Sequence, residues 1–386
     1  MCNILSYKRT EQVYMKMKTS SRTNSTFVLL ACFSMLLCIS QLANVVVCEC
    51  SRNMVIFNFG DSNSDTGGYC AAHGIRFGYP DGRSFFHDHP SDRLCDGRLI
   101  LDFLCESLNM SYLNAYLESV RPNFKNGENF AIGGATILPK NALFTLSTQV
   151  LQFIRFKARS LQLQSIGLKD LAEDDFKNAI YMIDIGQNDI ANEFSYLSKV
   201  SQVLEKIPSF ISEIQAAVWG IYNRGGKNFW IHNTGPLGCL PQKLATRNAS
   251  NLKDLDDYGC IKSMNEAAET FNNQLRALCE QLRLQMKDAT IVYVDIYAIK
   301  YDLIAHSSAY GIQNPLMVCC GFGGPPYNYN SNITCRQSGY SLCEEGSAYI
   351  SWDGVHYTEY ANAIVASKIL STNYSTPPLE LHHFCT

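Results

Sequence analysis

Short apolar runs alternate with longer, helix-like segments along the chain after residue 50. Several of the short runs are apolar at successive positions, which is typical of parallel strands that are buried on both faces. Strands are predicted over residues 55–59, 129–132, 180–185, 229–232 and 291–295. Because helical segments separate them, the pattern predicts an α/β fold with a doubly wound parallel sheet.

The clearest helical pattern covers residues 258–286. Its apolar side chains, among them Ile261, Phe271 and Leu278, recur at steps of three and four residues and form one stripe. Helices are also predicted over residues 148–163 and 361–370. We interpret the Cys- and Gly-rich stretch at about 305–350 as an insertion within a single domain that spans residues 50–386.

The N-terminus has a different pattern. Five basic residues precede a nearly unbroken apolar run from Phe27 to Cys48, as in a secretory signal. We predict that residues 1–49 form a signal peptide, cleaved between Ala43 and Cys50. The alternative is a membrane anchor, because the run approaches the roughly 20 residues that span a bilayer. No second apolar run of that length follows, so we expect no stable membrane span after cleavage.

Composition changes the picture in two respects. The chain has 386 residues, a formal net charge of −3 and no long basic run, which argues against nucleic acid as a partner. Of its sixteen cysteines, twelve follow residue 49, and an even number in an exported chain suggests disulfides. A zinc site is the alternative, but the chain has no C-x-x-C pair. The pairing cannot be deduced from the sequence.

Four N-x-S/T sequons follow the predicted signal, at Asn109, Asn248, Asn332 and Asn373. Each alone is a weak signal, but an export signal and many cysteines add weight to them. We therefore expect an extracellular protein that carries N-glycans, located in the cell wall or apoplast, with the vacuole as an alternative.

Polar, glycine-containing loops follow three of the predicted strands. They begin at Gly60, at Gly133-Gly134 and at Gly186, and sites in open parallel sheets form at these carboxyl ends. The plainer interpretation is that strand ends need turn residues, which Gly, Asn and Asp supply. Ser62 lies in the first of these loops.

A serine hydroxyl becomes a nucleophile when a histidine removes its proton, and a carboxylate usually orients that histidine. Among the eight histidines, His356 has Asp353 three residues before it, within "SWDGVHYTEYAN". A short turn before the predicted 361–370 helix can bring the two side chains together. For an isolated D-x-x-H, the alternative is a capping Asp and an incidental His.

Five motifs in order point to one family: "FGDSNSDTGG" at 59–68, "NFAIGGATI" at 129–137, "IGQNDI" at 185–190, "NTGPLGCLP" at 233–241 and "SWDGVHYTEYAN" at 351–362. Together they resemble the plant-type GDSL esterase/lipase family of the SGNH hydrolase superfamily. The resemblance covers about residues 54–370. It implies a flavodoxin-like, three-layer α/β/α sandwich with a parallel sheet.

The resemblance also assigns roles. Ser62 matches the nucleophile, His356 the base and Asp353 the carboxylate that orients it. The backbone N–H groups of Ser62 and Gly134 and the side chain of Asn188 match the oxyanion hole. Position 63 is Asn where the name motif has Leu, which indicates a subgroup. Whether Gly133 or Gly134 presents its N–H, and whether Asp61 caps a helix or braces the loop, stays open.

The expected function is a secreted serine esterase or lipase that needs no metal or cofactor. Its substrate is a small-molecule ester, and the sequence does not choose between a lipid, an acetylated sugar and a specialised metabolite. The first alternative is an acyltransferase that uses the same acyl-enzyme. A glycosidase would need paired carboxylates, which no motif provides, and a non-catalytic secreted glycoprotein would not need the complete set of site residues.

Overall fold

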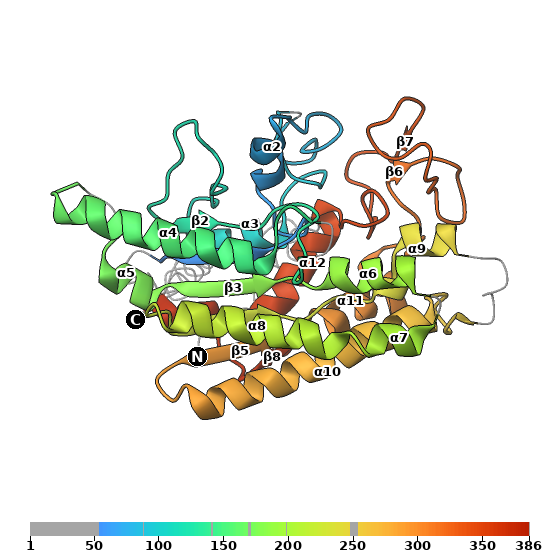
Figure 1. The fold of residues 1–386 in the computed structure, drawn as a ribbon. Helices are drawn as coiled ribbons and strands as arrows, with labels where there is room; N and C mark the ends of the chain where they lie inside the picture. Colours follow the sequence, from blue (N-terminus) through green and yellow to red (C-terminus); the bar gives the residue numbers. More distant parts are fainter. Residues whose placement is uncertain are drawn as a thin grey trace, which may run out of the picture. The chain divides into compact units, whose positions relative to one another are not determined.

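The computed structural model describes residues 54–87, 89–139, 142–168, 171–197, 199–247 and 254–385. The predicted signal peptide and the sequon at Asn248 lie outside these residues. The main sheet has the strand order β2-β1-β3-β4-β5-β8 (Figure 1). Its strands are β1 (Ile56–Gly60), β2 (Gly127–Asn129), β3 (Ile180–Asp184), β4 (Asn228–His232), β5 (Thr290–Val294) and β8 (Ser375–Thr376).

Strands β1 to β5 are parallel, and only the two-residue edge strand β8 is antiparallel among the described strands of this sheet. The order 2-1-3-4-5 is that of flavodoxin-like sheets, whose ligand sites lie beyond the carboxyl ends of the strands. In the register of β1 and β3, Gly60 lies opposite Asp184, so the two strands end together. The expected α/β/α class and parallel sheet are therefore confirmed.

Helices cover both faces of the sheet. On one face, α4, α8 and α10 bury Phe153, Phe210 and Phe271 in one apolar cluster. On the other, α3, α11 and α12 bury a second cluster. The α-helices of the described residues are α2 (Gly68–His73), α3 (Ile100–Ser107), α4 (Leu146–Ser165), α5 (Glu173–Asn178), α6 (Gln187–Tyr196), α7 (Val200–Leu204), α8 (Ile207–Tyr222), α9 (Pro241–Thr246), α10 (Lys262–Gln285), α11 (Ile296–Ala305) and α12 (Glu359–Leu370).

Strand β2 differs most from its predicted position. It covers Gly127–Asn129, whereas the apolar run predicted residues 129–132. The N–H groups of Phe130 and Ile132 nevertheless donate to the carbonyl oxygens of Asn58 and Gly60. The apolar run therefore continues beside β1 and delivers the Gly133-Gly134 loop to the end of that strand.

Helix α10 begins at Lys262, four residues after the predicted start. A turn occupies the preceding residues, where Asp256 Oδ1 accepts from the N–H groups of Tyr258 and Cys260. Cys260 is also joined to Cys239 by a disulfide. These constraints hold the chain in a turn until the helical stripe begins.

The aromatic side chains of β1 belong to a buried aromatic cluster. The Phe57 ring lies 5.3 Å, centre to centre, from the rings of both Phe153 and Phe176, and Phe59 lies 5.2 Å from Phe130. All of these rings are fully buried. Such pairs contribute about 1 kcal/mol each beyond the burial of their area, so the strand that leads to Ser62 is firmly held.

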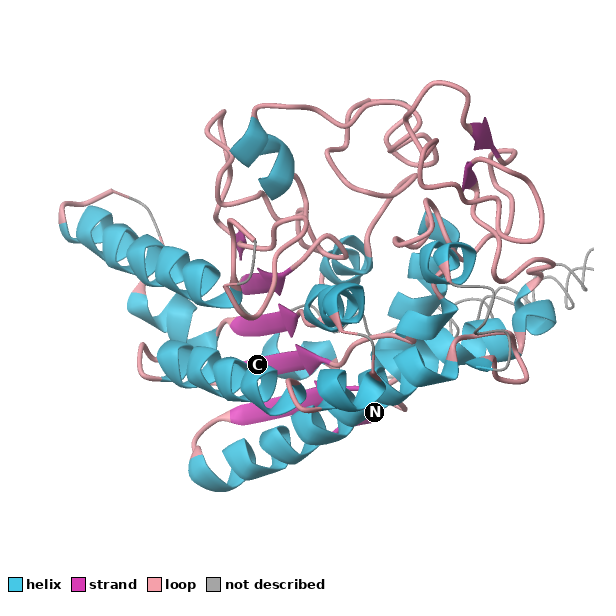
Figure 2. Ribbon diagram, turned by 45° about the vertical axis from the view of Figure 1, so that its right-hand side comes forward, coloured by secondary structure: helices cyan, strands magenta, loops and turns pink. Residues whose placement is uncertain are grey.

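Long loops gather on one side of the sheet, as Figure 2 shows. One group runs between β1 and α4. The other surrounds β6 (Cys320–Gly321) and β7 (Ser341–Leu342), where disulfides join Cys319 to Cys343 and Cys320 to Cys335. The predicted presence of disulfides is confirmed, although Cys70, Cys95, Cys105 and Cys279 are free and buried. Among the described helices, none is both long and apolar enough to cross a membrane.

Candidate active site

Ser62 lies in the turn that follows β1, where its side chain is nearly buried. Gly60 is needed just before the turn, because a Cβ there would come within 2.6 Å of the Asp184 carbonyl oxygen. In the turn, Asp61 Oδ1 accepts from both the backbone N–H and the side-chain amide of Asn63, each at 2.9 Å. Asp61 therefore braces the loop, and Asn63 provides a donor that Leu could not.

The carboxyl group of Asp61 lies in an unusual electrostatic environment. Burial and the nearby charge of Asp184 raise its pKa to about 6, whereas Asn63 and His356 oppose this shift. Burial also disfavours the ionised form of Asp184, yet His232 and Lys300 hold the pKa of Asp184 below its ordinary value. Two neighbouring carboxyl groups thus differ in their affinity for a proton.

Lys300 on α11 contributes a buried charge to the candidate site. Its side chain is buried, its charge acts on Asp61 and Asp184, and its Nζ lies 4.1 Å from the centre of the Tyr357 ring. Asp61 precedes Ser62, and Tyr357 follows His356. The Lys300 ammonium group therefore contacts the residue after the predicted base and interacts electrostatically with the residue before the predicted nucleophile.

Asp65 joins the Ser62 loop to the Gly133-Gly134 loop. Its carboxylate accepts from the backbone N–H groups of Gly67, Tyr69 and Gly133, at 2.8, 2.9 and 2.7 Å. It also accepts from Gly68 and so meets the N–H groups at the start of α2. The N–H of Gly133 is therefore engaged, which leaves Gly134 as the glycine of the pair that can present its N–H.

Gly134 is exposed and adopts a φ of +78°, a conformation that favours glycine. Ala135, which follows Gly134, holds the Asn188 side chain in place, because Asn188 Nδ2 donates to the Ala135 carbonyl oxygen over 2.9 Å. Asn188 lies in the first turn of α6 and is partly exposed. The loops of Ser62 and Gly134 are thus bonded to each other through Asp65, and Asn188, at the start of α6, is bonded to the Gly134 loop.

Asp189 strengthens the attachment of α6 to this loop. Its carboxylate accepts from the backbone N–H groups of Ile137 and Leu138, at 2.8 and 3.1 Å for the shortest bond to each. Burial raises the pKa of Asp189 to about 7, although these hydrogen bonds act to lower it. The motifs alone assign no role to Asp189 or Asp65, although both residues lie within them.

His356 and Asp353 form a direct pair. The Nδ1 atom of His356 lies 2.8 Å from Asp353 Oδ2, and Asp353 Oδ1 accepts from the backbone N–H groups of Val355 and His356. Burial opposes the ionisation of Asp353, but His356 and Arg336 hold its pKa well below the usual range. His356 Nε2 is buried and has no hydrogen-bond partner within the described residues. That nitrogen is therefore available to a hydroxyl group or a water molecule.

The structure does not join His356 to Ser62 directly. No hydrogen bond between the Ser62 hydroxyl and His356 Nε2 occurs in the described chain, although the charges of Asp61 and His356 interact. In apo active sites such bonds are often long or poorly aligned, and they tighten when substrate binds. Among the described residues, no group of three His, Cys, Asp or Glu side chains is arranged to hold a metal ion.

Comparison with known proteins identifies the family. A sequence model of the GDSL-like Lipase/Acylhydrolase family matches residues 56–369. The chain belongs to this family. The region that matches the GDSL model begins at the strand before Ser62 and extends into α12, beyond the His356 motif.

Relatives from Arabidopsis thaliana are similar over most of the chain. The GDSL esterase/lipase LIP-4 of Arabidopsis thaliana is 56% identical over 87% of this chain and 91% of its own length. Another Arabidopsis thaliana relative, named Alpha-L-fucosidase 3, is 42% identical over 81% of this chain and 89% of its own length. A comparison of structures aligns 72% of this chain with 92% of the chain in the crystal structure of phospholipase A1 from Streptomyces albidoflavus NA297. The aligned chains have 12% sequence identity and a TM-score of 0.33.

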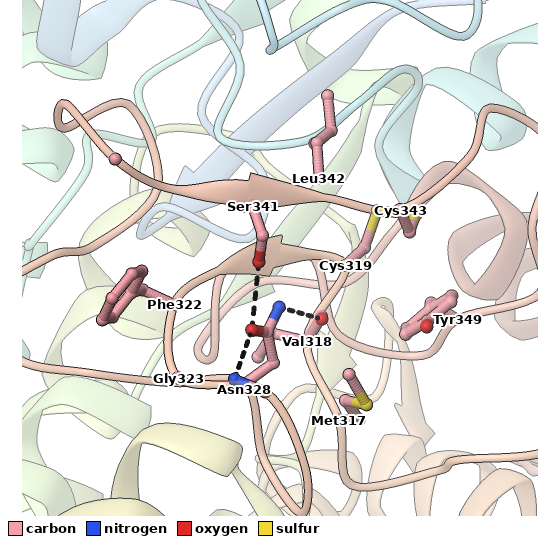
Figure 3. Close-up of a pocket in the computed structure, with 12 residues that line it drawn as sticks. Met317, Val318, Cys319, Phe322, Gly323, Asn328, Ser341, Leu342, Cys343 and Tyr349 are labelled. Atoms are coloured by element: carbon pink, nitrogen blue, oxygen red, sulfur yellow. Dashed lines mark hydrogen bonds between the residues drawn. A yellow bond between two sulfur atoms is a disulfide. The ribbon is translucent and has the colours of Figure 1, made fainter.

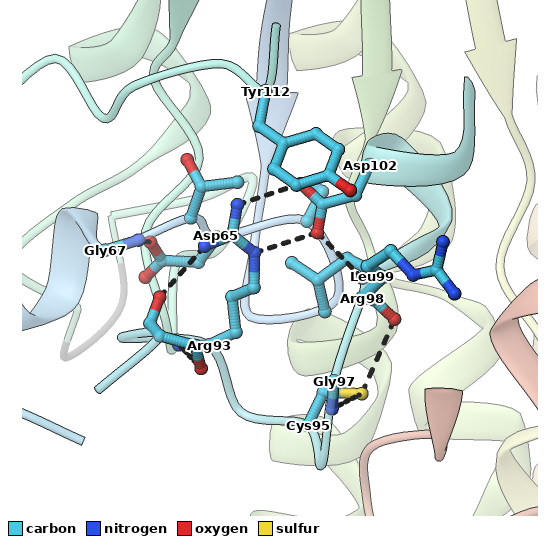
Figure 4. A network of polar contacts seen from close by, with 12 residues as sticks. Asp65, Gly67, Arg93, Cys95, Gly97, Arg98, Leu99, Asp102 and Tyr112 are labelled. Atoms are coloured by element: carbon cyan, nitrogen blue, oxygen red, sulfur yellow. Dashed lines mark hydrogen bonds and ion pairs between the residues drawn. The ribbon is translucent and has the colours of Figure 1, made fainter. Parts of the chain in front are cut away.

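A buried ion pair anchors the loop that precedes α3 in this GDSL protein (Figure 4). Arg93 Nε and Nη2 donate to the two oxygens of Asp102, each at 2.8 Å, and Asp102 is fully buried. The guanidinium group also lies over the Phe86 and Tyr112 rings, 5.0 and 5.8 Å from their centres. Residues 89–99, which precede α3, are therefore attached to that helix through Arg93.

A pocket of about 580 Å³ lies among the disulfide-linked loops (Figure 3). Asn328 organises it: its Oδ1 accepts from the Gly324 N–H and the Ser341 hydroxyl, and its Nδ2 donates to the Val318 carbonyl oxygen. The pocket is lined by Met317, Val318, Cys319, Phe322, Gly323, Gly324, Asn328, Gly339, Ser341, Leu342, Cys343 and Tyr349. None of the predicted catalytic residues lines it, so it is distinct from the candidate site.

Three of the four sequons lie among the described residues. Asn109, Asn332 and Asn373 are all exposed. Their side chains are thus accessible to modification, whereas Asn248 lies outside the described residues.

Proposed function

We propose that the protein is a serine esterase that hydrolyses carboxylic esters through an acyl-enzyme on Ser62. The observation that carries this proposal is the pair of His356 and Asp353, whose 2.8 Å contact leaves Nε2 without a partner among the described residues. Membership of the GDSL-like Lipase/Acylhydrolase family and relatives named GDSL esterase/lipase support it.

In the proposed reaction, His356 Nε2 removes the proton of the Ser62 hydroxyl as its oxygen attacks the ester carbonyl carbon. The tetrahedral intermediate collapses, and the imidazolium gives its proton to the departing alcohol. Water then attacks the acyl-enzyme with His356 again as base, which releases the acid and restores Ser62. Asp353 fixes the ring and stabilises the imidazolium, since it accepts at Nδ1.

The proposed oxyanion hole consists of the Ser62 and Gly134 N–H groups and the Asn188 amide. Gly133 is unsuited to this role because its N–H already donates to Asp65. One N–H of Asn188 binds Ala135, and its second N–H remains to bind the oxyanion. Donors fixed in place before the reaction stabilise the developing charge without reorganising.

The proposal includes export. The predicted signal peptide, the disulfides and the exposed sequons at Asn109, Asn332 and Asn373 support a secreted glycoprotein located in the cell wall or apoplast, or alternatively in the vacuole. The substrate class is a small-molecule ester, whether a lipid, an acetylated sugar or a specialised metabolite.

The relative named Alpha-L-fucosidase 3 makes a glycosidase worth testing. Such an enzyme needs two carboxyl groups that flank a sugar bond. Asp61 and Asp184 are neighbours with opposite pKa shifts. However, Asp61 is only 1% exposed and its Oδ1 is engaged by Asn63, so this pair favours a bracing role.

The test compares wild-type protein with Ser62→Ala on p-nitrophenyl acetate, butyrate and laurate, and on p-nitrophenyl α-L-fucoside. Loss of the nucleophile is expected to lower kcat for the esters by roughly 10⁴-fold or more. A fluorophosphonate probe is expected to label wild type and not Ser62→Ala. The matched control is Ser209→Ala, which removes an exposed hydroxyl on α8.

Ester hydrolysis by Ser62→Ala at the wild-type rate would refute the proposal. Cleavage of the fucoside alone would replace it with a glycosidase. The series of acyl lengths also ranks the ester substrates.

A further inference from the structure

Arg336 touches the predicted catalytic pair from the side of Asp353. Its Nη1 lies 3.7 Å from Asp353 Oδ2, the same oxygen that contacts His356 Nδ1. The Arg336 side chain is partly buried, with 27% of its surface exposed, and Asp353 is almost buried. A cation at this place acts on the charge of the pair without contacting His356 Nε2.

Asp81 holds Arg336 in place. The Nη2 atom of Arg336 donates to Asp81 Oδ1 over 2.7 Å, and Nε pairs with Oδ2, so the contact is bidentate. Asp81 is fully buried, and the indole N–H of Trp352 also donates to its Oδ1, over 2.9 Å. Such fork-shaped pairs fix orientation as well as distance.

These contacts form a closed ring with the backbone. Trp352 directly precedes Asp353, so Asp81 binds the chain just before Asp353 and, through Arg336, the Asp353 carboxylate. The Arg336 guanidinium also lies over the Phe77 ring, 5.2 Å from its centre. Two carboxylates and an aromatic ring thus restrain one guanidinium group.

The disulfide between Cys320 and Cys335 anchors Arg336 in the chain. Cys335 directly precedes Arg336, and Arg336 has a φ of +77°, which non-glycine residues seldom adopt. Such a conformation is imposed on a residue by its surroundings, and these conformations are common at functional sites.

We propose that Arg336 is a positioning residue of the candidate active site: clamped by Asp81, it holds the Asp353 carboxylate in place for His356 and opposes protonation of the imidazole. The inference rests on the proposed function, although its geometric basis is only the contact of Arg336 with the pair of Asp353 and His356. Arg336 contacts Asp353 and makes no hydrogen bond to His356 Nε2, so its proposed effect passes through Asp353.

Several charges of the described residues bear on this effect, among them Lys300, which acts on Asp61 and lies over the ring of Tyr357 next to His356. Asp353 and Asp61 act on His356, and Asp81 and Asp353 act on Arg336. The nearby Cys70 thiol is neutral at physiological pH because burial raises its pKa to about 12. Loss of the Arg336 charge removes one cation from beside the Asp353 carboxylate, which favours the imidazolium. Protonation of the buried Asp81 would offset part of this effect.

The experiment uses the full mature chain with Arg336→Gln, Arg336→Lys and Asp81→Asn. For Arg336→Gln, kcat/KM for p-nitrophenyl acetate is expected to fall roughly ten- to a hundredfold, chiefly in kcat. The acid limb of its pH profile is expected to move upward by roughly half a unit to one unit of pH. Compared with Arg336→Gln, Arg336→Lys is expected to restore the position of the acid limb more fully than kcat. Lysine returns the positive charge but cannot form the bidentate contact with Asp81.

A second readout does not depend on activity. The proton between His356 Nδ1 and Asp353 Oδ2 is expected to give a far-downfield ¹H NMR resonance in wild type, which shifts or broadens in Arg336→Gln. If wild type hydrolyses no ester, the proposed function fails while this resonance still decides the role of Arg336. Should Arg336→Gln not fold, Asp81→Asn gives the same comparison, because it loosens the clamp while the amide oxygen introduced at position 81 still accepts from Trp352.

The matched control is Lys227→Gln, which breaks an ion pair with Asp288 at the opposite end of β4. It is expected to leave the resonance and the acid limb unchanged. A merely structural Arg336 would lower Tm and the rate at every pH alike. An unmoved acid limb together with an unmoved resonance would overturn the proposal.

Discussion

The side-chain amide of Asn188 donates to the carbonyl oxygen of Ala135 over 2.9 Å. A carbonyl oxygen only accepts hydrogen bonds, so the NH₂ group of Asn188 must face it. One amide hydrogen is thereby used, and the planarity of the amide group fixes the direction of the other. Asn188, which provides one proposed oxyanion donor, is thus held in place by the loop of Gly134, which provides another.

Removal of this amide is expected to slow ester hydrolysis. Asn188→Ala deletes one oxyanion donor, so kcat should fall by about a hundredfold or more. The lost hydrogen bond to Ala135 should lower the free energy of unfolding by only about 1 kcal/mol. Steady-state kinetics and urea unfolding measure the two effects separately. Asn178→Ala, at the end of α5, is the control; full activity in Asn188→Ala would contradict the assigned role.

Asp61 is expected to make stability depend on pH. Its pKa is raised from 3.8 to about 6 in the fold. Between these values the folded chain keeps a proton that the unfolded chain releases, so the free energy of unfolding falls as the pH rises through this window. Asp61→Asn removes this proton equilibrium and still accepts from Asn63. Relative to wild type, its stability should therefore rise by up to about 3 kcal/mol from pH 4 to pH 7.

Urea unfolding at pH 4, 5, 6 and 7 measures this difference. Asp174→Asn, which replaces an exposed carboxyl group on α5, should show no comparable change. A constant difference between Asp61→Asn and wild type across the window would show that Asp61 does not bind a proton more tightly in the fold.

The buried pair of Arg93 and Asp102 is expected to dominate the stability of the loop before α3. Arg93→Met leaves the fully buried Asp102 carboxylate without its cation, which should cost about 3–5 kcal/mol. Asp102→Asn together with Arg93→Met should cost less than the sum of the single changes, because no lone charge remains.

A double-mutant cycle in urea or guanidinium measures this coupling. Lys227→Met at the surface pair with Asp288 is the control, since exposed pairs contribute at most about 1 kcal/mol. Additive effects of Arg93→Met and Asp102→Asn would argue against the ion pair as the source of the stability.

The strands of the fold could be predicted well from the sequence, because burial on both faces leaves a continuous apolar signal. Thus β3 and β4 lie within one residue of their predicted bounds. By contrast, β8 consists of Ser375 and Thr376, which carry no strand signature, and pairs with β5 only because the chain returns there after α12. Helix α8 is missing from the predicted elements, since it is rich in apolar residues and begins beside Pro208.

Within the candidate site, sequence could assign only the residues that lie in motifs. Asp353 and His356 are three residues apart, so a local turn predicts their contact. Arg336 and Asp81 are 255 residues apart and meet only through the fold. Asp65 shows a third case: it lies beside Ser62 in sequence, but its bond to Gly133 depends on the pairing of β1 with β2.

Cys319 and Cys320 are adjacent, yet each is bonded to a different partner, Cys343 and Cys335. A protease that cuts between Cys320 and Cys335 therefore leaves both new ends tied by those two bonds. A cut between Cys335 and Cys343 leaves them tied through Cys319. The segment that carries Asp353 and His356 thus stays attached to the rest of the protein after nicking in this region, and the fragments separate only once the disulfides are reduced.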